Sequence, residues 1–186
     1  MKRLAALTAL TIVAAVGLAT PAYADSRTCR GTLRAISVDG DVIVPSGASC
    51  TLLGRSVDGN VQVKSGATLT TINAEIGGNV QAENHRAVTI KQRTSVGGSV
   101  QIDQGGPARV AQSTVDGSIQ LKQNSGPHAI LGNTVGSDVQ VFTNTRGVKI
   151  SSNFIDGNLQ CKSNTPAPTG GDNVVQGEKE DQCASL

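Results

Sequence analysis

The segment SVDGNVQV, residues 56–63, ends in an alternation of apolar and polar residues that is typical of a half-buried β-strand. Val57 precedes a turn that contains Gly59, and Val61 and Val63 then flank the polar Gln62. Nearly the same segment recurs along the chain. The recurrence decides the fold, because a segment used many times at a fixed interval indicates a repeat architecture.

Residues equivalent to Val57 recur every 19 or 20 residues. These anchors are Val38, Val57, Ile76, Val96, Val115, Val135, Ile155 and Val175. A unit this short cannot bury its own apolar face, whereas stacked units share one continuous core. The sequence therefore predicts an all-β fold: a single-stranded parallel β-helix of about eight turns of 19–20 residues, capped by disulfides at both ends. A right-handed coil is expected, because parallel crossovers strongly prefer that hand.

Each turn is expected to contain three short strands. In the second turn they are predicted at NVQV (60–63), ATLTTI (67–72) and NAEI (73–76). The glycine that follows seven of the eight anchors by two residues is expected at a corner, where φ is positive or where successive turns stack closely.

The N-terminus has the features of a secretory signal peptide over residues 1–24. Lys2 and Arg3 precede an apolar run over 4–18, and small residues stand at Ala22 and Ala24. The run is shorter than the ~20 residues that a membrane-spanning helix needs. We therefore expect a secreted, extracellular protein without a membrane span in its mature form.

The mature chain is expected to be one β-helix domain, 25–186, with an N-terminal cap at 25–36 and a C-terminal cap at 162–186. Removal of Lys2 and Arg3 leaves 14 basic residues (16 minus 2) against 14 acidic ones. A net charge near zero argues against nucleic acid as a partner.

Four cysteines in a secreted chain indicate two disulfides, for which three connectivities exist. Cys29 and Cys50 are 21 residues apart and Cys161 and Cys183 are 22 apart, so each pair spans about one turn. A bond between the two ends would have to cross the whole stack, against a Cα separation of about 6 Å in a disulfide. The repeat thus predicts Cys29–Cys50 and Cys161–Cys183.

Two columns of amide side chains follow from the period. Outward-facing glutamines stand five residues after the anchors, at Gln62, Gln81, Gln101, Gln120, Gln140 and Gln160. Stacked amides can hydrogen-bond from turn to turn, which stabilises the strand face; the alternative is a regular polar face that binds a glycan or another polymer. Asparagines two residues before the anchors, Asn133, Asn153 and Asn173, are expected to form a second ladder that stabilises turns.

Asp39 and Asp58 are the sharpest catalytic candidates. They follow anchors of adjacent turns, so their carboxylates are expected about 5 Å apart, a spacing that suits two carboxylates in glycoside hydrolysis. Solvated turn residues are the simpler interpretation, because Asp favours exposed turns. His85 and His128 are expected to be ordinary corner-loop residues, and neither metal nor cofactor is expected.

The two cysteine-containing ends, CRGTLRAISVDGDVIVPSGASCTLLG (29–54) and FIDGNLQCKSNTPAPTGGDNVVQGEKEDQC (154–183), resemble small secreted repeat proteins of actinobacterial type. This resemblance implies a right-handed parallel β-helix and carries no catalytic residues over. A looser likeness in fold is to bactofilin-type polymer-forming proteins, from which the signal peptide and the cysteines depart. Pectate-lyase-like enzymes share the coil but are longer and have acidic clefts flanked by basic residues.

We therefore expect a secreted, non-enzymatic structural or surface-interaction protein of the cell envelope or extracellular space. It is expected to be a monomer with a cell-wall or extracellular polymer as partner. The alternative is a small glycan-binding or polysaccharide-active β-helix that uses Asp39 and Asp58 or the glutamine column. End-to-end self-assembly is a third possibility. Fold alone does not decide among them.

Overall fold

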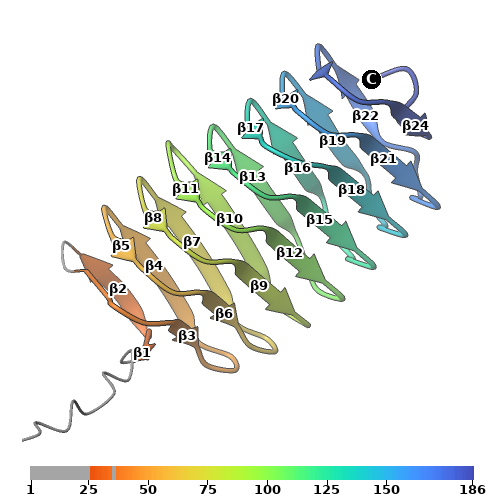
Figure 1. The fold of residues 1–186 in the computed structure, drawn as a ribbon. Coiled ribbons are helices and arrows are strands. Elements are labelled where there is room, and N and C mark those ends of the chain that lie inside the picture. Colours follow the sequence, from red (N-terminus) through yellow and green to blue (C-terminus); the bar gives the residue numbers. More distant parts are fainter. Residues whose placement is uncertain (1–25, 35–36) are drawn as a thin grey trace, which may run out of the picture.

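The computed structural model describes residues 26–34 and 37–186. The predicted signal peptide, 1–24, lies outside these residues. The described chain contains strands and no helix, and it winds as a parallel β-solenoid with three sheets along its axis (Figure 1). Over the described ranges, no helix has the length and apolar character needed to cross a membrane.

The first sheet has nine strands, one from each level of the stack. They are β1 (Arg27–Thr28), β3 (Val42–Val44), β6 (Val61–Val63), β9 (Val80–Glu83), β12 (Val100–Asp103), β15 (Ile119–Lys122), β18 (Val139–Phe142), β21 (Leu159–Lys162) and β24 (Lys179–Asp181). The NVQV-type segments form this sheet, in which apolar and polar residues alternate between core and surface.

The second sheet has eight strands. They are β2 (Gly31–Arg34), β4 (Ser49–Leu53), β7 (Thr68–Ile72), β10 (Ala87–Lys91), β13 (Ala108–Ala111), β16 (His128–Leu131), β19 (Val148–Ser151) and β22 (Thr169–Gly171). The predicted ATLTTI strand corresponds to β7.

The third sheet has seven strands of two residues each. They are β5 (Ser56–Val57), β8 (Glu75–Ile76), β11 (Ser95–Val96), β14 (Thr114–Val115), β17 (Thr134–Val135), β20 (Phe154–Ile155) and β23 (Val174–Val175). Each contains one anchor, and the remaining anchor, Val38, forms a parallel bridge with Val57.

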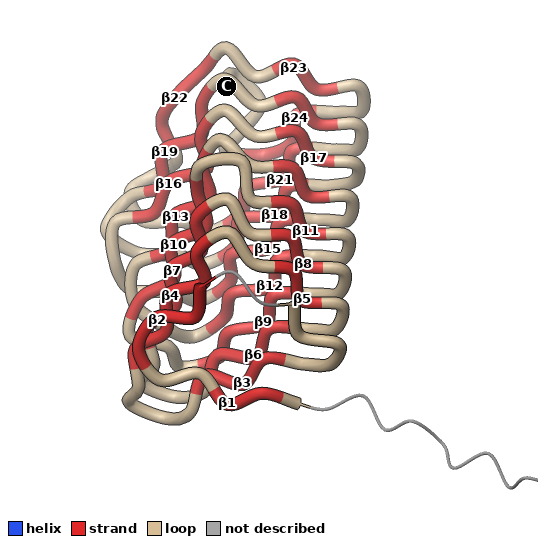
Figure 2. Tube along the Cα trace, turned by 90° about the vertical axis from the view of Figure 1, so that its left-hand side faces the viewer, coloured by secondary structure: helices blue, strands red, loops and turns tan. Residues whose placement is uncertain are grey.

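All strand pairs are parallel, and residues one repeat apart are direct neighbours. Figure 2 shows the resulting columns of strands. Grouped in threes from β4, the strands make seven complete turns, with partial turns at the N-terminal end. The predicted parallel β-helix and its three strands per turn are confirmed, while the handedness stays a prediction from the crossover preference.

The core is a set of stacked aliphatic columns. Val57, Val61 and Val63 of the opening segment are at most 2% exposed, as are Leu69 and Ile90 in the second sheet. Aliphatic side chains that repeat in register bury a continuous apolar surface, and this burial is the main favourable term in folding.

Both predicted disulfides are present. Cys29–Cys50 joins neighbouring turns near one end with a Cα–Cα distance of 5.6 Å, and Cys161–Cys183 does so near the other end with 5.3 Å. Cys183 and Leu186 belong to the hydrophobic core cluster, so the C-terminal tail covers the last turn. Two disulfides indicate an oxidising environment.

Candidate functional site

The glutamine column lies on the outer face of the nine-stranded sheet. Each glutamine is in register with that of the next turn. Three amide-to-amide hydrogen bonds run along it: Gln81 to Gln101 (3.0 Å), Gln120 to Gln140 (3.2 Å) and Gln140 to Gln160 (2.9 Å). The predicted hydrogen-bonded column is therefore present in segments.

The column ends on carboxylates and is interrupted within. The Gln62 amide donates to Asp41 (3.1 Å), and the Gln160 amide donates to both carboxylate oxygens of Glu180 (3.1 Å each). Within the described chain, no amide hydrogen bond joins Gln62 to Gln81 or Gln101 to Gln120. Hydrogen-bonding capacity is thus left over at the turns that carry Gln62, Gln81 and Gln101.

An open hollow of about 410 Å³ lies at these turns. It is lined by Gln62, Gln81 and Gln101 and by the polar residue two positions after each of them, Lys64, Glu83 and Asp103. A second hollow shares Gln101 and Asp103 with the first and extends to the next turn. The two hollows therefore form one shallow track along the solenoid axis.

The residues beside the glutamines form a second outward column that sequence reasoning missed. It contains Lys64, Glu83, Asp103, Lys122, Phe142 and Lys162, each seven residues after an anchor. Their period could have identified them, but their residue types vary. The outer face thus combines uniform amides with a neighbouring column of mixed charge.

The two lysines beside the carboxylates are engaged elsewhere. Lys64 Nζ donates to Gln62 Oε1 at 2.9 Å, and Lys122 Nζ lies over the Phe142 ring, 5.9 Å from its centroid. The Oδ1 atom of Asp103 is buried and has no hydrogen-bond partner in the described chain. This enclosed oxygen is out of reach of a ligand, so Asp103 can accept a hydrogen bond from one only through Oδ2, which is not enclosed.

Asp39 and Asp58 lie on adjacent turns, since the backbone N–H of Asp58 donates to the carbonyl of Val38 at 2.9 Å. Both are exposed, and Asp58 Oδ1 accepts from Ser56 Oγ at 3.4 Å. Neither lines the track on the glutamine face, and Asp39 instead lines a separate depression beside Arg27. The structure therefore places the glutamine and aspartate candidates at different positions around the turn.

A third ladder, which the sequence reasoning missed, stabilises the corner that precedes the nine-stranded sheet. One side-chain oxygen per turn accepts from a backbone N–H of the following turn, at 2.7 to 3.3 Å. The acceptors are Asp41, Asn60, Asn79, Ser99, Ser118, Asp138 and Asn158. The hydrogen bonds of these side-chain oxygens therefore stabilise the fold.

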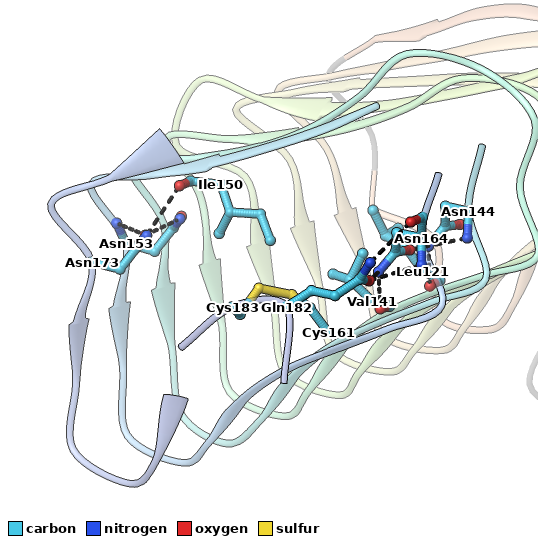
Figure 3. The surroundings of a disulfide bond; sticks show 10 residues. All are labelled: Leu121, Val141, Asn144, Ile150, Asn153, Cys161, Asn164, Asn173, Gln182 and Cys183. Carbon is cyan, nitrogen blue, oxygen red and sulfur yellow. Dashed lines mark hydrogen bonds between the residues drawn. A yellow bond between two sulfur atoms is a disulfide. The ribbon is translucent and has the colours of Figure 1, made fainter. Parts of the chain in front are cut away.

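Two asparagine ladders lie inside the coil, on either side of the Cys161–Cys183 disulfide in Figure 3. The predicted ladder of Asn133, Asn153 and Asn173 is present, and its amides also donate to main-chain carbonyls of the second sheet. The other asparagine ladder was not predicted from the sequence; it contains Asn124, Asn144 and Asn164 and ends at Gln182. All six asparagines are buried, so both ladders are structural.

The expectation that His85 and His128 are ordinary corner-loop residues is wrong for His128, which lies in β16, whereas His85 lies in the loop between β9 and β10 but is buried. They are only 3% and 4% exposed, because His85 packs over Gly105 of the next turn and His128 occupies an inward position of β16. Burial lowers the pKa of both imidazoles, against smaller opposing effects of nearby backbone groups. In addition, His85 lowers the pKa of His128 by charge repulsion.

Comparisons with protein-family models, with curated proteins and with solved structures find no match to this chain. The surface chemistry described above is therefore the basis for the functional proposal.

Proposed function

We propose that this chain is a secreted, non-enzymatic structural or surface-interaction protein of the cell envelope or extracellular space. Its interaction surface is the outer face of the nine-stranded sheet. The observation that carries the proposal is the pair of breaks in the glutamine ladder, between Gln62 and Gln81 and between Gln101 and Gln120, beside open hollows. Side-chain amides that keep unused donors and acceptors on a rigid strand face suit an extended polar partner.

The distribution of polar groups supports this assignment. The buried asparagines and the corner oxygens are engaged in ladders, whereas the carboxylates of Glu83 and Asp103, two residues that line the hollow, accept no hydrogen bond within the described chain. Secretion is supported by the basic and apolar features of residues 1–24 and by the two disulfides.

Binding to envelope material tests the proposal. The purified protein is mixed with isolated cell envelopes and with precipitated extracellular polymer from the producing organism, and the bound fraction is measured after sedimentation. We expect retention of the wild type and weaker retention of a Gln81→Ala/Gln101→Ala variant. Gln140→Ala is the matched control, because Gln140 belongs to the same column but does not line the hollow.

Two results would contradict the proposal. Failure of the wild type to sediment with either material would remove the interaction. Reproducible polysaccharide depolymerisation that is lost in Asp58→Asn would instead support the hydrolytic alternative, in which the carboxylates of adjacent turns act as a pair.

A further inference from the structure

We infer that the track on the outer face is a binding site for an extended, neutral polyhydroxylated chain, a polysaccharide without charged groups, in which Glu83 and Asp103 accept hydrogen bonds from sugar hydroxyls. This inference rests on the proposed function and specifies its ligand. It assigns the central role to two residues that lie beside the glutamine column.

Two carboxylates in the hollow supply the hydrogen-bond acceptors. Glu83 and Asp103 are direct neighbours in register, at the ends of β9 and β12, so their side chains extend from adjacent turns on the same face. Asp103 Oδ1 is enclosed and has no donor. A ligand hydroxyl therefore donates to the other oxygen, Oδ2, and to the exposed carboxylate of Glu83, and hydrogen bonds to ionised acceptors are the stronger kind.

Side-chain amides in the hollow supply the hydrogen-bond donors. The hollow presents the Gln101 amide, whose Nε2 donates no hydrogen bond in the described chain, and the Gln81 amide, which uses one of its two N–H groups on Gln101. A hydroxyl both donates and accepts. Donors and acceptors that alternate across neighbouring turns therefore match a ligand with many hydroxyl groups.

The local charge excludes strongly charged polymers as the preferred ligand. Lys64, Glu83, Asp103 and Lys122 occupy four consecutive turns of one column and sum to zero formal charge. A polyuronate would meet the two carboxylates, and a polyamine would meet the two lysines, so each would bring like charges together. A neutral chain uses both kinds of group without this repulsion.

The shape of the site favours a polymer over a single sugar. The two hollows share Gln101 and Asp103 and span the turns from Gln62 to Lys122. The strands stack about 4.8 Å apart, so successive turns offer equivalent groups at a constant interval along the axis. An extended chain lying along the axis can contact several turns at once, which raises avidity.

Affinity electrophoresis and titration calorimetry test the inference. The wild type is compared on a panel of neutral glucans and mannans, on polygalacturonate and on chitosan. We expect binding to at least one neutral polymer and an affinity lowered about tenfold in Asp103→Asn, because the variant exchanges an ionised acceptor for a neutral amide. Glu83→Gln is the second variant. Asp116→Asn, which makes the same charge change at an exposed corner outside the track, is expected to bind like the wild type.

The outcomes separate this inference from the proposed function. Circular dichroism and thermal melting first establish that each variant is folded. The inference is wrong, and the proposed function stands, if the wild type sediments with envelope material but binds no neutral polymer of the panel or prefers polygalacturonate or chitosan. The same holds if both carboxylate variants bind the neutral polymer like the wild type. If the wild type sediments with neither material, the proposed function itself fails.

Discussion

Asn144 and Gln140 lie four residues apart in one turn and carry the same functional group in opposite surroundings. The Asn144 side chain is fully buried: its Oδ1 accepts from the backbone N–H of Asn124 (3.0 Å), and its Nδ2 donates to the carbonyl of Leu121 (2.8 Å). Gln140 is partly exposed and exchanges amide hydrogen bonds with Gln120 and Gln160. Water can replace the partners of Gln140 but not those of Asn144.

Asn144→Ala is therefore expected to lower the free energy of unfolding by about 3 kcal/mol, because it leaves a buried N–H and a buried carbonyl without partners at roughly 1–3 kcal/mol each. Gln140→Ala is expected to cost less than about 1 kcal/mol. Urea denaturation followed by circular dichroism measures both. Equal losses in the two variants would show that the inner ladder is no more important than the outer one.

Successive corners approach each other closely at the repeated glycine. A Cβ added at Gly78 would lie 2.8 Å from the carbonyl carbon and oxygen of Gly59. Gly78 does not have a positive φ, so of the two reasons expected for this glycine, close stacking is the one that applies. The corner is fixed by backbone-to-backbone packing between turns.

Gly78→Ala should consequently destabilise the protein by about 1–3 kcal/mol, since the added methyl group forces neighbouring backbones apart. Ser137→Ala is the control in the same column, because that position already carries a Cβ. Thermal melting of the two variants gives the comparison. A melting temperature of Gly78→Ala equal to that of the wild type would mean that the turns separate without cost.

The strands could be predicted because their alternation and the period of 19 or 20 residues are explicit in residue types. The corner that follows the nine-stranded sheet could not be predicted. Its residues Asn84, Gln104, Gln123 and Thr143 have left-handed backbone conformations, which their residue types do not indicate. The corner ladder was missed because Asp, Asn and Ser alternate in it and share only an acceptor oxygen. The hollow could not be predicted, because the sequence does not show which glutamine amides hydrogen-bond to each other and which do not.

At the level of the whole molecule, one inner ladder ends in the middle of the stack. His85 occupies the position that Asn124, Asn144 and Asn164 hold in later turns, and Gly105 between them leaves room for its ring. His128 approaches the same level from the other side, where its Nδ1 accepts from the backbone N–H of Ala108 at 3.2 Å. Both nitrogens of His85 and the Nε2 of His128 are buried without hydrogen-bond partners in the described chain.

These two histidines make stability depend on pH. Burial lowers the pKa of each below its ordinary value of 6.5, so the unfolded chain binds more protons than the folded one. The free energy of unfolding is therefore highest above a pH of about 6.5, the pKa of histidine in the unfolded chain. It decreases as the pH falls from there toward the lower pKa of the two histidines in the folded chain. Urea unfolding at pH 7.5, 6.5, 5.5 and 5.0 is expected to show this decline.

His85→Asn supplies the control for the pH series. The substitution places at position 85 the residue type that the later turns carry, so the fold is expected to be retained while one titrating group is removed. The stability of this variant should decline less between pH 7.5 and 5.0. Superimposable declines in the variant and the wild type would assign the pH dependence to other groups.

The register of the strands has a consequence for how this protein can change in length. Each strand pairs only with the equivalent strand one turn before and one turn after, and β15 and β18 are offset by 20 residues. Residues 115–134 thus form one full period that contains Gln120, Asn124 and Asn133. A tandem duplication of this segment would lengthen the axis by about 4.8 Å and extend the glutamine column and both inner ladders by one member each. Duplication or deletion of one such segment can therefore change the length of the solenoid while the other turns keep their structure.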